Sequence, residues 1–251
     1  MSVSHTAGIG SATFYALGEI HATDVVGLSE NGPSLFMDGY QIAVIDNSDL
    51  TAGLLGGIVI FSSMFLQSGG YISISNSKLT TLGADMPGLW FGNINKTVSL
   101  TNTEVITASG ILAVANYSQI TQDFDYYAGY TDNPSLSPAT VDINIAESTL
   151  VGDIVPYNGS TINWNLTQYS SWTGTAYSGF GVAYANIFLD SSSTWTMTND
   201  TTVSKLISDD DSLSNIDSQG YNIYYDSVDY DNSWLDGKTL SLAGGGKVAP
   251  L

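Results

Sequence analysis

Several residue types are missing or scarce in this chain of 251 residues. There is no cysteine, which excludes disulfides, thiolate nucleophiles and thiolate metal sites together. There is no arginine either, and five lysines face 24 acidic residues, for a net charge of −19. Proteins hold nucleic acid chiefly through Lys and Arg contacts to phosphates. We therefore expect no nucleic-acid partner.

Long hydrophobic runs are scarce as well. The longest, residues 53–66, contains the pair Gly56-Gly57 and is shorter than the ~20 apolar residues that a membrane-spanning helix needs. We read this run as a pair of buried strands and expect no membrane insertion.

Histidine is limited to His5 and His21, both near the N-terminus. A Ser-His-Asp triad or a histidine-based metal site therefore cannot be assembled over the rest of the chain. We expect His21 to be an exposed side chain, and we assign no catalytic residue, no metal ligand and no cofactor.

What the chain does contain is a repeat. An apolar residue, a spacer, a polar residue that is often Asn, a small residue, another spacer and a second apolar residue recur in the same frame. Ile45–Leu50, Ile74–Leu79 and Leu100–Val105 superpose without gaps, Ile20–Val25 fits the same frame, and Ile145–Leu150 fits it with Glu in place of Asn. Two further copies, Leu166–Trp172 and Leu189–Trp195, carry one extra residue.

The spacing of the copies predicts an all-β fold, a single right-handed parallel β-helix. Most copies begin 21 to 29 residues after the previous one, and each turn has room for two or three short strands but shows no helical periodicity. We expect about seven turns over residues 20–199, an N-terminal cap over 1–19, and C-terminal capping strands with a tail over 200–251. The single long spacing reflects a loop inserted at 119–139.

Two kinds of position in the frame have a structural explanation. Inward residues such as Ile74 and Leu100 should stack into one core, each contributing about 1.5–3 kcal/mol when fully buried. The asparagines Asn47, Asn76 and Asn102 fall where a strand turns, and Asn tolerates the left-handed backbone that a corner requires. We read them as a structural ladder.

The C-terminal third carries a more specific pattern. Trp195–Asp200, Val203 and Leu206, followed by Gly244–Gly246, resemble the passenger-type β-helix of autotransporters, adhesins and related large microbial surface proteins. The resemblance implies an extracellular or cell-surface solenoid and does not imply a reaction. The motifs that carry it are structural.

The inserted loop is the best candidate for recognition, because loops on a rigid scaffold commonly carry binding residues. Tyrosine rings can stack on sugars, and nearby carboxylates can accept hydrogen bonds from sugar hydroxyls. The candidate ligand-binding residues are Asp123, Asp125, Tyr126, Tyr127 and Tyr130. We therefore expect a non-enzymatic adhesin or structural (coat or filament) protein whose partner is a glycan, a cell-surface protein or another copy of itself.

Three alternatives remain open. A carbohydrate-active enzyme, either a polysaccharide lyase or a glycoside hydrolase, could use a lysine base or the acidic strip of Glu104, Asp142 and Glu147. Ice binding is suggested by the many threonines, although the outward columns mix residue types. The acidic groups around Asp123, Asp209–Asp211 and Asp226–Asp231 could bind calcium weakly, although none has the spacing of a known calcium loop.

The chain also holds five Asn-x-Ser/Thr acceptor sites for N-glycosylation. They begin at Asn95, Asn116, Asn158, Asn165 and Asn199. Their use would agree with an extracellular location.

Overall fold

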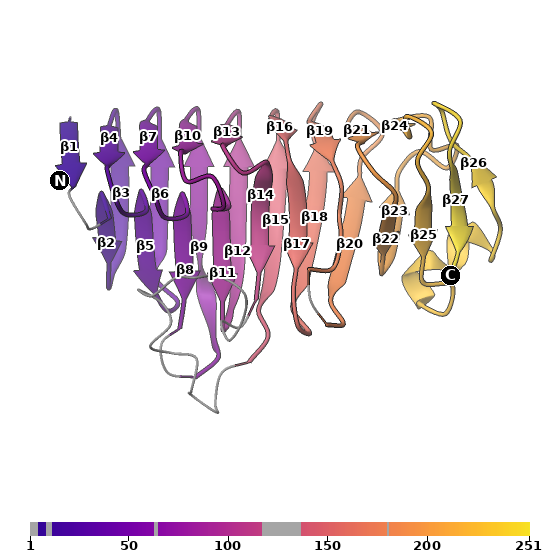
Figure 1. The fold of residues 1–251 in the computed structure, drawn as a ribbon, viewed down its shortest axis with the longest axis horizontal. Helices are drawn as coiled ribbons and strands as arrows, with labels where there is room; N and C mark the ends of the chain where they lie inside the picture. The colour runs from indigo at the N-terminus through magenta and orange to yellow at the C-terminus, as the bar shows by residue number, and fades with distance from the viewer. Residues whose placement is uncertain (1–4, 9–11, 63–64, 117–136, 180) are drawn as a thin grey trace.

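The computed structural model describes residues 5–8, 12–62, 65–116, 137–179 and 181–251. The chain winds as a parallel β-solenoid of about nine turns, with the N-terminus at one end of the long axis and the last strands at the other (Figure 1). This confirms the all-β parallel fold. The expected candidate loop residues Asp123, Asp125, Tyr126, Tyr127 and Tyr130 lie outside the described residues.

Eight parallel strands form one continuous face of the rod, which we call the long sheet. In chain order they are β3 (Glu19–Thr23), β6 (Ile42–Asp46), β9 (Gln67–Ser75), β12 (Ile94–Thr101), β15 (Thr140–Ala146), β18 (Thr161–Thr167), β20 (Tyr184–Leu189) and β23 (Lys205–Ser208). Six of the seven sequence copies pair in the predicted register. Ile45 lies opposite Ile74, the pairing continues through Leu100, Ile145 and Leu166, and Leu189 lies opposite Leu166.

The register predicted for the first copy is wrong by two residues. Ala22, and not Ile20, lies opposite Ile45, while Ile20 pairs with Ala43. The reason is the corner that follows, where Asp24 takes the left-handed conformation with φ 58°. In the predicted register the corner would fall on Ala22, but Asp accepts the left-handed conformation better than Ala, so the polar residue sets the register.

Two further parallel sheets complete the cross-section of the first turns. The groove sheet consists of β1 (His5–Gly8), β4 (Val26–Ser29), β7 (Asp49–Ala52), β10 (Lys78–Thr81) and β13 (Glu104–Thr107). The aromatic sheet consists of β2 (Phe14–Ala16), β5 (Leu35–Asp38), β8 (Ile58–Phe61), β11 (Leu89–Gly92), β14 (Ile111–Ala115) and β17 (Asp153–Pro156). In the run 53–66, β8 is the one strand among the described residues, so the expected pair of buried strands is wrong.

Beyond β13 the face of the groove sheet continues as a separate sheet of four strands, the tryptophan sheet. Its strands are β16 (Thr149–Val151), β19 (Ser171–Gly174), β21 (Thr194–Met197) and β24 (Ile216–Asp217). No strand ladder joins β13 to β16 among the described residues, although the long sheet and the aromatic sheet continue past this point, the latter with a register shift between Ile111 and Ala113. We call this interruption the sheet break.

The interior is a single hydrophobic column with a tryptophan stack near its C-terminal end. Ile and Val from successive turns are fully buried, as predicted, and Trp172 and Trp195 stack with their ring centroids 4.8 Å apart. Both indole N–H groups donate to backbone carbonyls of the preceding turn, those of Gly152 and Gly174. These rings therefore fill the core without leaving their nitrogen atoms unpaired.

The outer side of the aromatic sheet is buried too. Phe36, Phe61 and Trp90 pack edge-to-face from turn to turn with ring centroids 5.2 and 6.2 Å apart, and each is at most 4% exposed. Leu55 and Met86 pack against this second cluster. The outer side of this sheet is therefore a second, smaller hydrophobic core.

The number of turns was underestimated because strands continue at both ends. Residues 5–8 and 14–16, expected in a cap, form β1 and β2 and pair in register with β4 and β5. After Asn199 the coil continues through β23, β24 and an end sheet. The end sheet contains β22 (Thr201–Val203), β25 (Ile223–Tyr225), β27 (Lys247–Pro250) and the antiparallel β26 (Leu240–Ser241).

The C-terminal end is closed by local structure. A 3-10 helix, η2 (Tyr230–Leu235), lies against β23, where the Asn232 side chain accepts from the Leu206 N–H and Trp234 Nε1 donates to the Leu206 carbonyl. Gly244–Gly246 form the turn between β26 and β27. The free edge of the long sheet is thereby covered, as stable solenoids require. No helix among the described residues is long and apolar enough to cross a membrane.

Candidate functional site

The corner asparagines lie in one column along the rod. Asn47, Asn76 and Asn102 all take the left-handed conformation, with φ values of 46°, 49° and 46°, and Asp24 and Glu147 do so at the equivalent corners. Asn102 Nδ2 donates to Asn76 Oδ1 at 2.9 Å. The ladder is not uniform, because Asn76 donates to Asp46 and Asn47 donates to Asp24.

A second ladder, which sequence reasoning missed, lies directly beside the asparagines. Ser48, Ser77 and Ser148 are at most 7% exposed. Each Oγ accepts the backbone N–H of the equivalent residue one turn earlier, at 3.0–3.1 Å, and donates to a carbonyl two residues before its own. The Ser or Thr after each corner Asn is visible in the repeat, but its burial is not. The two columns together tie neighbouring corners to one another.

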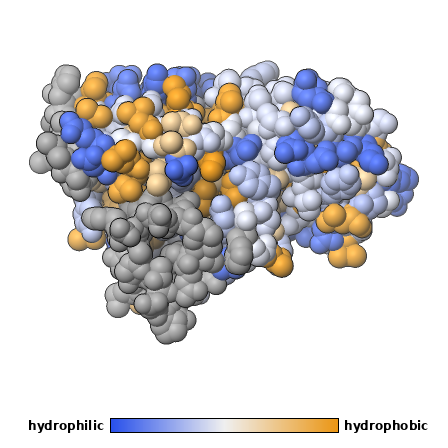
Figure 2. Space-filling model, viewed as in Figure 1, coloured by the Kyte–Doolittle hydropathy of each residue, from blue (hydrophilic) through white to orange (hydrophobic). Residues whose placement is uncertain are grey.

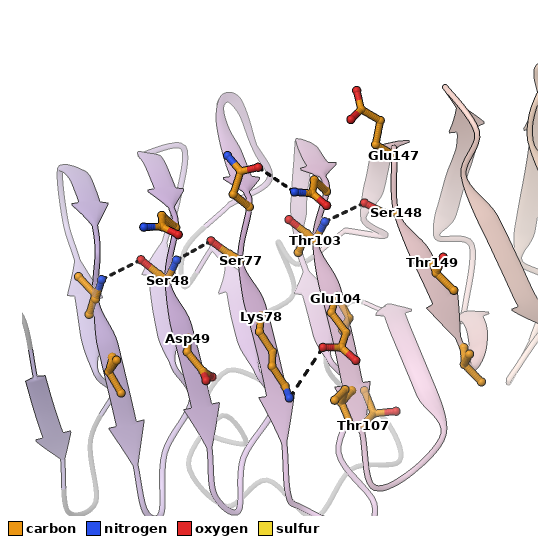
Figure 3. A pocket seen from close by; sticks show the side chains of 18 of the residues that line it. Ser48, Asp49, Ser77, Lys78, Thr103, Glu104, Thr107, Glu147, Ser148 and Thr149 are labelled. Carbon is orange, nitrogen blue, oxygen red and sulfur yellow. Dashed lines mark hydrogen bonds and ion pairs between the residues drawn. The ribbon is translucent and has the colours of Figure 1, made fainter.

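These corners form one wall of a concave surface of about 1080 Å³ that crosses β4, β7, β10, β13 and β16, which we call the groove. Its lining repeats from turn to turn, because equivalent residues stack at ~4.8 Å. The solvent-facing polar residues after the corners are Asp49, Lys78, Glu104 and Thr149 (Figure 3). Five strands at this spacing give the groove a length of about 19 Å.

The groove crosses the sheet break. The corner stays closed there, because Thr103 N–H donates to Ser148 Oγ and Asn102 N–H donates to the Ala146 carbonyl. Below the corner, the exposed apolar side chains of Ile106 and Val151 line the groove on either side of the break. The surface therefore offers polar groups along one wall and apolar carbon on its floor.

The groove is strongly acidic. Of the charged residues that line it, four are carboxylates, from Asp24, Asp49, Glu104 and Glu147, and one is the ammonium of Lys78. Lys78 Nζ lies 3.8 Å from Glu104 Oε2. Just behind the corner, hydrogen bonds from Ser75 and Asn76 lower the pKa of Asp46, which adds an ionised carboxylate near the same wall.

The residues weighed for catalysis do not converge. Asp142 lies in β15 and Glu147 at the corner that follows it, so the four extended steps from Asp142 to Ala146 already separate their backbones by about 13 Å at ~3.3 Å per residue. A glycosidase pair needs roughly 5–10 Å. Glu104 and Glu147 both line the groove, but Figure 3 shows the Glu147 carboxylate pointing away from Glu104.

The lysines are equally dispersed. Lys78, Lys205 and Lys238 each form an ion pair with a nearby carboxylate, and Lys247 lies in β27. Lys96 is 3% exposed and donates to the carbonyls of Gln41 and Gly69. Burial lowers the pKa of Lys96 to about 8, but its amine faces the interior and not the groove.

Carboxylates in the acidic loops already have partners within the protein. Hydrogen bonds from Ser212 and Ser214 lower the pKa of Asp210 to about 2, and Asp231 pairs with Lys205. Within the described ranges, no group of three or more His, Cys, Asp or Glu is placed to hold a metal ion. Weak calcium binding, including at Asp123, stays a prediction.

The threonines that suggested an ice-binding plane do not share one face. Thr81 and Thr103 are buried, Thr101 lies on the long sheet, and Thr194 and Thr196 lie on the tryptophan sheet.

The five acceptor asparagines differ in accessibility. Asn116 is 1% exposed. Asn95 and Asn165 lie in strands and donate side-chain hydrogen bonds to the neighbouring turn, whereas Asn158 occupies a turn with φ 52° and Asn199 is exposed.

No family model, curated protein or solved structure matches this chain. The groove is therefore interpreted from its own geometry.

Proposed function

We propose that the protein is an extracellular or cell-surface β-solenoid that binds a glycan chain in the groove and performs no reaction on it. The observation that carries this proposal is the stacking of equivalent polar residues at ~4.8 Å along a groove that is open at the surface. An extended pyranose chain advances by a similar length per sugar. Successive sugars can therefore meet successive copies of the same polar position.

The chemistry of the walls supports the same ligand class. A pyranose ring has a hydroxyl edge and an apolar C–H face. The corner asparagines and Thr149 offer hydrogen-bonding groups to the edge, and Ile106 and Val151 offer carbon to the face. Ile106 is 38% exposed and Val151 is 62% exposed, so this apolar surface is open to a ligand.

We propose a second contact in the insertion at 119–139. Its residues Tyr126 and Tyr127 are proposed, on their sequence alone, to stack on the same or a separate glycan. A role as an adhesin or coat subunit follows if the ligand belongs to a cell surface or to another copy.

The absence of native cysteine allows a clean test. Thr149→Cys places a single thiol in the groove, and Ser99→Cys places one on the outward side of the long sheet as a matched control. Both proteins are labelled with a bulky maleimide and titrated with immobilised glycans. Labelling at 149 should abolish binding, whereas labelling at 99 should leave it unchanged.

Two results would contradict the proposal. Equal binding by both labelled proteins would place the ligand outside the groove. Release of new reducing ends or unsaturated products from the bound glycan would show an enzyme instead of a binding protein.

A further inference from the structure

We infer that the groove selects uncharged or amine-bearing glycans and rejects chains rich in uronic acid. This inference rests on the proposed function and names the ligand class for the same site. It follows from how the charges of the lining residues are arranged.

The one ammonium in the groove, among the described residues, is already engaged. Lys78 Nζ lies 3.8 Å from Glu104 Oε2, and Lys78 is directly opposite Asp49 in the paired strand β7 (Figure 3). A carboxylate entering the groove would have to displace Glu104 from Lys78 and would still lie near Asp49. No arginine exists in the chain to compensate.

The remaining carboxylates lie along the same wall. Asp24 and Glu147 occupy corners at opposite ends of the groove, and Asp49 lies between them. Each repels an anion and attracts a cation at a distance of a few ångströms, where exposed charges still interact despite salt. Amines on successive sugars would meet carboxylates on successive or alternate turns.

The charges outside the groove do not offset the negative potential of the carboxylates that line it. The whole chain carries a net charge of −19, and the ionised Asp46 lies behind the corner column. Long-range steering therefore adds to the local preference.

The experiment compares three hexasaccharides of equal length by calorimetry at mildly acidic pH and low salt. They are the oligomers of glucosamine, of N-acetylglucosamine and of galacturonic acid. We expect glucosamine to bind at least about tenfold more tightly than galacturonate, with the difference shrinking as salt screens the charges.

The variant Glu104→Gln tests the assignment to this pair. It frees Lys78 and removes one carboxylate, so it should raise galacturonate affinity and lower glucosamine affinity by about fivefold each. Glu19→Gln removes the same charge from the exposed strand β3, outside the groove, and should change neither affinity.

The outcomes separate the two proposals. Galacturonate binding that equals or exceeds glucosamine binding overturns the selection while leaving a glycan-binding groove. Binding of none of the three oligomers overturns the proposed function and the selection with it. A fivefold response of Glu19→Gln equal to that of Glu104→Gln would overturn the assignment to the groove.

Discussion

The buried Lys96 should make the stability of this protein rise with pH. Its side chain is 3% exposed, it contacts two backbone carbonyls, and no carboxylate among the described residues pairs with it. Burial lowers its pKa from 10.5 to about 8 in the folded state. In the unfolded chain the same amine should titrate near its ordinary value.

The sign follows from proton binding. Between pH 8 and 10.5 the unfolded chain holds a proton on Lys96 that the folded protein has released, so unfolding takes up a proton and stability increases with pH. Each pKa unit corresponds to about 1.4 kcal/mol, which gives a total of about 3 kcal/mol. The contribution is absent below the folded pKa and complete above the unfolded one.

The assay is urea unfolding followed by far-UV circular dichroism from pH 7 to 11, for the wild type, Lys96→Met and Lys96→Gln. Both variants lose the titrating amine, and Gln keeps a hydrogen-bond donor. Tyrosines and the other lysines titrate in all three proteins, so the difference between wild type and variant isolates Lys96.

We expect the wild type to gain about 3 kcal/mol relative to both variants across this range. A constant difference would show that the amine is hydrated in the folded protein, and the reasoning would fail. Because neither Met nor Gln titrates in this range, the pH-dependent gain should be the same against both, and the offset between the two variants measures the carbonyl contacts.

Three further predictions concern stability and modification. Trp195→Ala should reduce the free energy of unfolding by about 3–5 kcal/mol, because the ring is fully buried and stacks on its neighbour; an effect under about 1 kcal/mol in urea unfolding would contradict this. Gly246→Ala should destabilise the C-terminal hairpin, because its new Cβ would lie 1.7 Å from the Tyr221 carbonyl oxygen, and a lower melting temperature by calorimetry checks it. After expression through a secretory pathway that glycosylates, mass spectrometry of the folded protein should find glycan at the exposed Asn199 and none at the buried Asn116.

The fold could be predicted because its determinants are local and repeated. Alternating apolar residues specify strands, and an Asn before a small hydroxyl residue marks three of the corners, so Ile45, Ile74 and Leu100 could be aligned without coordinates. The prediction for the first copy is wrong because Ile20 resembles the last inward residue before the corner. That position belongs to Ala22, two residues before the left-handed Asp24. The repeat pattern shows which residues are apolar, but it does not show which residue takes the left-handed conformation at the corner.

The groove could not be predicted in the same way. It depends on which outward columns stay open and on a break between β13 and β16, and neither is encoded in the repeat. The two strands that flank the break, β13 and β16, lie on either side of the insertion at 119–139 in the sequence, and the length of that insertion alone does not predict a break. The burial of Ser77 could not be predicted for a similar reason, because a serine beside a corner is equally compatible with a solvent-facing position.

The sheet break also has a mechanical consequence. Of the three sheets that surround the core here, the long sheet and the aromatic sheet continue past β13 and β16, while the groove sheet ends at β13. Under bending or tension the rod should yield first at the sheet break, because fewer interstrand hydrogen bonds carry the load there. Amide protons on the two strands beside it should exchange with solvent sooner than those of the tryptophan stack, which would make this turn a hinge in an otherwise stiff filament-like body.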